Sequence, residues 1–125
     1  MPRTEVVFFR EDDESVPLLD WLTLLPPKAL VKCLAKLARL EELGYELRRP
    51  EADLLRDGIY ELRVRLGTVN YRMLYFFHGR AAAVVSHGLT KEKIVPPAEI
   101  DHAIERKTKF EADPEKHRFQ PEPRG

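Results

Sequence analysis

Residues 58–93 contain three short segments with the pattern of β-strands, and tight turns separate them. In residues 59–66 and 69–78, successive side chains are expected to point to opposite faces, as they do along any strand. Gly67 and Gly79 mark the turns, and residues 81–86 supply the third strand. Strands joined this closely predict an antiparallel meander, around which the rest of the chain must pack.

The two longer strands differ in what their faces carry. One face of residues 59–66 is apolar, and the other holds Glu61, Arg63 and Arg65. Residues 69–78 are largely apolar on both faces, which is typical of a central strand covered on both sides. Arg72 stands out there, because an arginine is rarely buried without a partner. We predict a phosphate as that partner.

The flanking segments are mostly helical. Residues 5–10 resemble a first strand, and Ser15 is a plausible N-cap for a helix that Pro26-Pro27 ends. A second helix follows from Pro27 to Gly44 with a continuous apolar stripe that includes Cys33 and Leu34. Residues 45–57 form a connection with room for one helical turn. A last helix follows Pro96-Pro97 and ends near Phe110.

This order, β-α-α-β-β-β-α, predicts an α+β fold. We expect a small antiparallel sheet, with the first strand at an edge and a helical hairpin packed on one face. The length favours one domain, which we place at residues 1–112. Residues 113–125 contain three prolines, alternating charges and few apolar side chains, so we predict a flexible C-terminal tail.

Composition narrows the class of protein. The chain is 43% hydrophobic and 34% charged, which is ordinary for a globular protein. No apolar run approaches the ~20 residues that span a bilayer, and residues 1–10 lack the pattern of a signal peptide. We therefore expect a cytoplasmic protein without membrane contact. Cys33 is the single cysteine, and we predict that its thiol is buried on the second helix.

Charge is distributed unevenly, although the net charge is zero. Residues 58–93 hold six Lys or Arg against two Asp or Glu, and both flanks are acidic. This indicates an anionic ligand for the strand region. The alternative explanation of this charge distribution is that strands carry few carboxylates in any protein.

The candidate site consists of six cationic or titratable side chains that a meander could bring to one concave face: Arg63, Arg65, Arg72, His87, Lys91 and Lys93. Several cations at one spot would bind a phosphodiester and stabilise the charge that develops on it. In RNA cleavage the 2′-hydroxyl is the nucleophile, so the protein need only position the strand and move protons. Glu61 and His87 are candidates for proton transfer, although a structural role for His87 stays open. Tyr60 and Tyr71 face the other side and belong to the core.

No phosphate-binding glycine loop, metal-ligand spacing or Gly-x-Ser-x-Gly elbow is present. Residues 58–65 (GIYELRVR) and 71–77 (YRMLYFF) instead resemble the sheet signature of the HigB-like, phage-derived branch of the RelE toxin superfamily. Residues 87–91 (HGLTK) are similar to its His-Gly-Phe-x-Lys-Lys segment, and residues 97–106 to its Pro-x-x-Glu-Ile-x-x-Ala-x-x-Arg helix. The resemblance covers residues 5 to about 112 and implies a RelE-like fold.

The resemblance implies the toxin of a type II toxin–antitoxin pair, an endoribonuclease that cuts mRNA on the ribosome without a metal or other cofactor. It implies a helix-turn-helix antitoxin of the HigA type as partner, which alone contacts operator DNA. By position, Arg72 and Lys91 would contact the scissile phosphate, with His87 as acid or base. Arg63, Arg65, Lys93 and Glu61 would lie along the RNA.

The sequence departs from the family pattern at two positions. Leu89 replaces the usual Phe, and Glu92 stands where the second lysine is expected. The alternative function is therefore a catalytically weak or inactive homologue that acts as binding partner and co-regulator of the antitoxin.

Overall fold

The computed structural model describes residues 3–90 and 93–120. Its helices are α1 (Pro17–Leu22), α2 (Pro27–Leu43) and α3 (Pro97–Ala112), with a short 3-10 turn, η1 (Gly44–Glu46). Its strands are β1 (Glu5–Phe9), β2 (Ala52–Arg56), β3 (Ile59–Leu66), β4 (Val69–His78), β5 (Ala82–Thr90) and β6 (Arg118–Phe119). The α+β fold class is confirmed.

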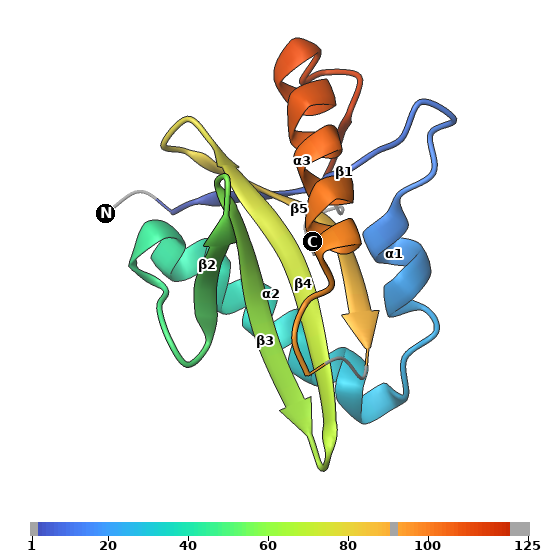
Figure 1. Cartoon of the computed structure of the whole chain (residues 1–125), viewed down its shortest axis with the longest axis vertical. Coiled ribbons are helices and arrows are strands. Elements are labelled where there is room, and N and C mark those ends of the chain that lie inside the picture. Colours follow the sequence, from blue (N-terminus) through green and yellow to red (C-terminus); the bar gives the residue numbers. More distant parts are fainter. Residues whose placement is uncertain (1–2, 91–92, 121–125) are drawn as a thin grey trace, which may run out of the picture.

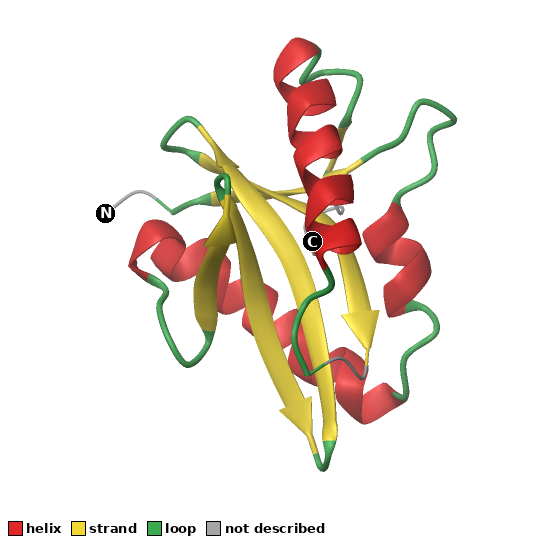
Figure 2. Ribbon diagram, viewed as in Figure 1, coloured by secondary structure: helices red, strands yellow, loops and turns green. Residues whose placement is uncertain are grey.

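One six-stranded sheet runs in the order β2-β3-β4-β5-β1-β6 (Figures 1 and 2). The meander from β2 to β5 is antiparallel, whereas β1 pairs with β5 in parallel. We expected β1 at an edge, and this was wrong, because β6 pairs with Phe8 and Phe9 on the outer side of β1.

Helices cover both faces of the sheet. Helices α1 and α2 pack on one face, where Leu18, Leu37 and Leu40 join Leu62 and Met73 in one core. On the opposite face, α3 contributes the apolar side chains Ile100, Ala103 and Phe110 to a second core with Leu74 and Phe76 of β4 (Figure 1). The predicted helical pair on one face is confirmed, and α3 explains why β4 is apolar on both sides.

Each of the three helices begins at a proline, whose missing N–H costs no hydrogen bond in the first turn. Helix α2 begins at Pro27 and ends before Gly44, whose φ of 51° suits a residue without a Cβ. Ser15 does not cap α1, because its hydroxyl donates to Asp13 Oδ1 at 2.6 Å and the helix begins at Pro17. Cys33 is buried as predicted, whereas Leu34 is 44% exposed and lies off the buried stripe.

Two segments differ from the sequence-based expectation. Residues 45–57 contain strand β2, whose Leu54 lies opposite Tyr60 of β3. The expected loose tail is docked as far as residue 120: β6 pairs with β1, and the buried His117 ring stacks on Phe9 at 5.1 Å between ring centroids. Residues 121–125 lie outside the described residues, and a domain boundary at residue 112 stays a prediction.

Candidate functional site

A cleft of about 470 Å³ lies on the α3 face of the sheet, between strands β3 and β4 and the segment that precedes α3. Three cations and one carboxylate line it, together with apolar and amide side chains: Arg63, Arg72, Lys93, Glu61, Leu55, Asn70, Ile94 and Val95. The period of two along β3 and β4 turns Arg63 and Arg72 to this face, where they are direct cross-strand partners. The structure thus brings together four of the seven predicted site residues.

Arg72 is held firmly at the floor of the cleft. Its side chain is only 12% exposed. Nη1 donates to Glu61 Oε1 at 2.6 Å, and Nη2 donates to the backbone oxygen of Lys93 at 2.5 Å. Nε is buried without a hydrogen-bond partner among the described residues. The buried arginine thus has a carboxylate as its partner in the structure, and the predicted contact of Arg72 with a phosphate stays a prediction.

Glu61 joins the two arginines of the cleft. It is 2% exposed, and its Oε2 accepts from Arg63 Nε at 3.1 Å and from Nη2 at 2.8 Å. Arg63 also reaches Asp53 at 3.3 Å. A carboxylate so deeply buried would be costly without such partners. Both oxygens of Glu61 are occupied, so a role as proton acceptor requires Arg72 or Arg63 to exchange partners first.

Of the other predicted cations, Lys93 lies at the rim of the cleft and Arg65 does not line it. Arg65 is exposed and donates to the backbone oxygen of Gly67 at 3.0 Å, away from the side chains that line the cleft. Lys93 is exposed at the rim. Lys91, predicted to contact the phosphate, and Glu92 lie outside the described residues.

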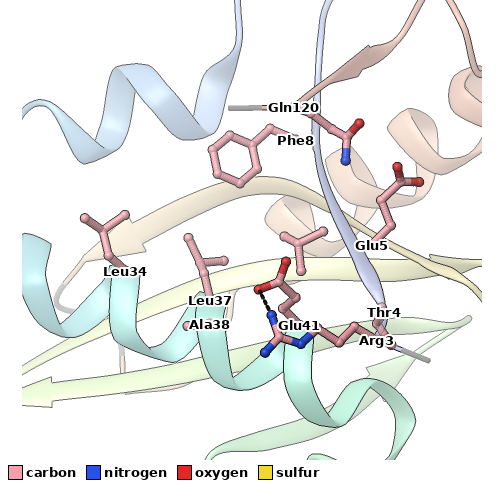
Figure 3. A pocket seen from close by; sticks show the side chains of 10 residues that line it. Arg3, Thr4, Glu5, Phe8, Leu34, Leu37, Ala38, Glu41 and Gln120 are labelled. Atoms are coloured by element: carbon pink, nitrogen blue, oxygen red, sulfur yellow. Dashed lines mark ion pairs between the residues drawn. The ribbon is translucent and has the colours of Figure 1, made fainter. Parts of the chain in front are cut away.

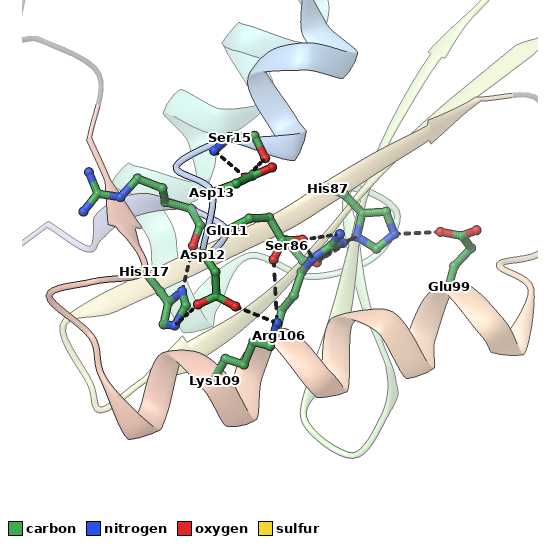
Figure 4. Close-up of polar contacts among 11 residues, drawn as sticks. Glu11, Asp12, Asp13, Ser15, Ser86, His87, Glu99, Arg106, Lys109 and His117 are labelled. Atoms are coloured by element: carbon green, nitrogen blue, oxygen red, sulfur yellow. Dashed lines mark hydrogen bonds and ion pairs between the residues drawn. The ribbon is translucent and has the colours of Figure 1, made fainter.

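His87 belongs to a separate polar network beneath α3 (Figure 4). It lies opposite Leu74 on β5 and is 8% exposed. Its Nδ1 lies 3.0 Å from Arg106 Nη1 and 2.7 Å from Ser86 Oγ, and its Nε2 lies 2.8 Å from Glu99 Oε1. His87 does not line the cleft of Arg72, so the structure does not bring these two predicted catalytic residues together.

The contacts of His87 define its tautomer. A guanidinium can only donate, so Nδ1 carries a lone pair and Nε2 donates its hydrogen to Glu99. Burial lowers the pKa of His87, partly opposed by the hydrogen bond with Glu99, and the positive charge of Arg106 lowers it further. Arg106 in turn donates to Glu11 at 2.9 and 3.1 Å. A buried, neutral imidazole with both nitrogens bonded serves to join β5, α3 and the segment after β1.

Sequence reasoning missed this network, although one signal was present. Glu99 and Arg106 are seven residues apart on one helix, and this spacing places both side chains on the same face. Nothing in the pattern marked Glu11 or Ser86, which come from distant parts of the chain.

The model of the family described as phage-derived protein Gp49-like (DUF891) matches residues 20–108. The chain belongs to the Gp49-like family. This is a family of type II toxin–antitoxin toxins related to RelE and HigB. The match includes β2 to β5 and α2, and therefore the cleft and most of the His87 network, whereas β1 and β6 lie outside it. A comparison with curated proteins found no match.

The Gp49-like chain has a second, larger hollow of about 750 Å³ between α2 and β1 (Figure 3). Its walls are mostly apolar, with Val6, Phe8, Leu34 and Leu37, and an ion pair of 3.8 Å between Arg3 and Glu41 lies at its margin. Charges of both signs at this margin make it a poorer phosphate site than the cleft of Arg72.

Two further features of this Gp49-like protein concern residues 3–90 and 93–120. Within these ranges, no three His, Cys, Asp or Glu side chains gather in a way that could hold a metal ion. Over the same part of the chain, no helix is both long and apolar enough to cross a membrane.

Proposed function

We propose that this Gp49-like toxin is an endoribonuclease that cleaves mRNA on the ribosome without a metal ion. The observation that carries the proposal is the cleft in which Arg72 and Arg63 project side by side from two paired strands, with Lys93 at the rim. A guanidinium fork matches the geometry of a phosphate better than any other side chain does. Strands of a packed sheet hold such groups in place before the substrate arrives, which is what stabilisation of a developing charge requires.

In the proposed reaction, a phosphodiester enters the cleft and replaces Glu61 as the partner of Arg72 Nη1. The oxygen of Glu61 that is released accepts the proton of the 2′-hydroxyl, and the 2′-oxygen attacks phosphorus. The bond to the 5′-oxygen breaks, and that oxygen takes a proton from water at the open side of the cleft. Arg63, Arg72 and Lys91 stabilise the extra negative charge, and Arg65 and Lys93 hold the flanking RNA. Because its imidazole is buried and neutral, His87 supports the position of α3 in this scheme.

The test is induction of the protein in growing cells, with growth and the length of a reporter mRNA as readouts. Arg72→Ala should relieve both effects, and so should Arg72→Lys, which keeps a cation beside Glu61 but loses the fork. Arg80→Ala is the control, since Arg80 is exposed in the turn between β4 and β5. Growth and mRNA that stay unchanged on induction of the unaltered protein would refute the proposal.

Glu61 favours a second candidate, a catalytically inactive homologue that acts as partner and co-regulator of its antitoxin. The carboxylate already satisfies Arg72 and takes two hydrogen bonds from Arg63, so the cleft is less cationic than the sequence indicates. Stable co-purification with the antitoxin, together with intact RNA after incubation with the free protein on ribosomes, would support this candidate over the first.

Both candidates share the partner implied by the family, an antitoxin. We propose that it is a helix-turn-helix protein of the HigA type, that it alone contacts operator DNA, and that both proteins act in the cytoplasm. Binding of the purified toxin to an operator fragment in the absence of antitoxin would contradict this arrangement.

A further inference from the structure

A third hollow, of about 500 Å³, lies beside the edge strand β2. It combines two aromatic side chains with two guanidiniums, Tyr45 and Tyr60 with Arg48 and Arg49. Strand β2 is the first strand of the sheet order, as Figure 1 shows, so one of its sides is open. The proposed chemistry of the Arg72 cleft does not use any of these four residues.

The aromatic side chains of the hollow belong to one cluster around Phe77. The Tyr45 ring lies on Phe77, with 3.7 Å between ring centroids and 22° between ring planes. The Tyr60 ring lies nearly perpendicular to Phe77, with 5.3 Å between ring centroids. Tyr45 is nevertheless 49% exposed, and its hydroxyl donates to the backbone oxygen of Gly79 at 2.9 Å. A ring that is supported from behind, held by its hydroxyl and open in front is a platform for a flat ligand.

The charged side chains favour an anion at this platform. Asp53 is the one carboxylate of the lining, and Arg49 holds it at 3.0 Å. That hydrogen bond lowers the pKa of the Asp53 carboxyl. Arg48 is exposed and makes no ion pair with another described residue. The hollow therefore offers a guanidinium beside an open aromatic ring, the combination that binds the base and phosphate of a single-stranded nucleic acid.

The hollow and the Arg72 cleft meet at β2. Leu54 and Tyr60 line the hollow on the α2 side, whereas Leu55 and Glu61 line the cleft on the α3 side. Asp53 connects them, because it lines the hollow and pairs with Arg63 of the cleft at 3.3 Å. A single-stranded RNA that leaves the cleft has to cross only β2, a strand of five residues, to reach Tyr45.

We propose that this hollow is a second RNA subsite, in which Tyr45 stacks on a base and Arg48 contacts a phosphate of the strand that extends from the Arg72 cleft. The inference rests on the proposed function, because it takes single-stranded RNA as the ligand. It predicts a contribution to binding that is separate from cleavage.

The experiment measures the anisotropy of fluorescein-labelled oligouridine with the full chain over a series of salt concentrations. Tyr45→Leu should weaken binding about fivefold or more, the lower range of a lost base stack. Tyr45→Phe keeps the ring and should bind like the unaltered protein. Arg48→Gln should reduce the slope of log K against log salt by about 0.7, as expected for one phosphate contact on a single strand. Arg80→Gln is the control and should leave the slope unchanged.

The outcomes separate this inference from the proposed function. If the unaltered protein binds no oligouridine, the second subsite is overturned, whereas the proposed function is refuted only by the induction experiment. If Arg72→Ala weakens RNA binding but Tyr45→Leu and Arg48→Gln do not, only the second subsite is overturned. If Tyr45→Leu spares RNA binding and weakens the complex with the antitoxin, the hollow is a protein-docking surface and the inference is wrong. Far-UV circular dichroism of each variant reports on the fold.

Discussion

Replacement of Glu61 by Gln should destabilise the protein far more than replacement of a partly exposed carboxylate. Glu61 is 2% exposed and is the only acidic partner of Arg72 among the described residues, and the Arg72 side chain is 12% exposed. Removing one partner of a buried ion pair costs about 3–5 kcal/mol, because the other charge stays buried. Arg63 is 38% exposed and still pairs with Asp53, so the loss of its contact with Glu61 adds no more than about 1 kcal/mol.

The glutamine oxygen can still accept one hydrogen bond, so we expect the lower end of that range, about 3 kcal/mol. At roughly 3–5 °C per kcal/mol for a chain of this size, the unfolding midpoint should fall by about 10 °C. Urea unfolding followed by circular dichroism measures the free energy directly. Glu51→Gln is the matched control, because the Glu51 carboxylate also joins two cations but is 25% exposed, and it should cost less.

A double-mutant cycle identifies the cause. Glu61→Leu and Arg72→Met should each destabilise the protein, whereas the combined variant leaves no buried charge and should lose clearly less than the sum of the two. Additive losses, or a Glu61→Gln variant as stable as Glu51→Gln, would refute the view that the floor of the cleft is a buried ion pair.

Two further changes test other parts of the structure. The pKa of His87 is lowered in the folded state. As pH falls below about 6.5, the unfolded chain therefore takes up a proton at His87 before the folded chain does. The free energy of unfolding should be complete above that pH and decline below it, by up to ~1.4 kcal/mol per pH unit. His87→Gln should remove this decline, whereas replacement of the exposed His102 by Gln should leave it in place. If the decline persists in His87→Gln, it is caused by another titratable group. A Cβ at Gly88 would lie 2.2–2.6 Å from indole carbons of Trp21, so Gly88→Ala should displace the ring, cost about 1–3 kcal/mol and shift the tryptophan emission to longer wavelength. An unchanged emission spectrum and unfolding midpoint would contradict the packing of Trp21 on Gly88.

Local pattern was sufficient to predict most of the framework. The alternation in β3 and β4 assigned Arg63 and Arg72 to one face and Tyr60 and Tyr71 to the other, because side-chain direction in a strand has a period of two. The proline pair predicted the start of α2 and Gly44 its end, because both residue types act on the backbone at their own position. These are properties of a few neighbouring residues.

Strand β2 and strand β6 were missed because their own residues do not favour a strand. Ala52–Arg56 lacks β-branched and aromatic side chains, and it becomes a strand by pairing with β3. Arg118–Phe119 is two residues in a proline-containing polar segment, and the buried stack of His117 on Phe9 holds it against β1. In both cases the stabilising contacts come from residues distant in sequence.

The sequence by itself determined that an arginine would lie in a central strand and would need a partner, because burial of an unpaired charge is costly. Only the tertiary structure decided which partner. The register that sets Arg63 opposite Arg72 brings Glu61 within 2.6 Å of Arg72, whereas His87 meets Arg106 because α3 covers β5 at that point. A pattern of faces shows which side chains share a surface, and strand register and helix placement decide which of them touch.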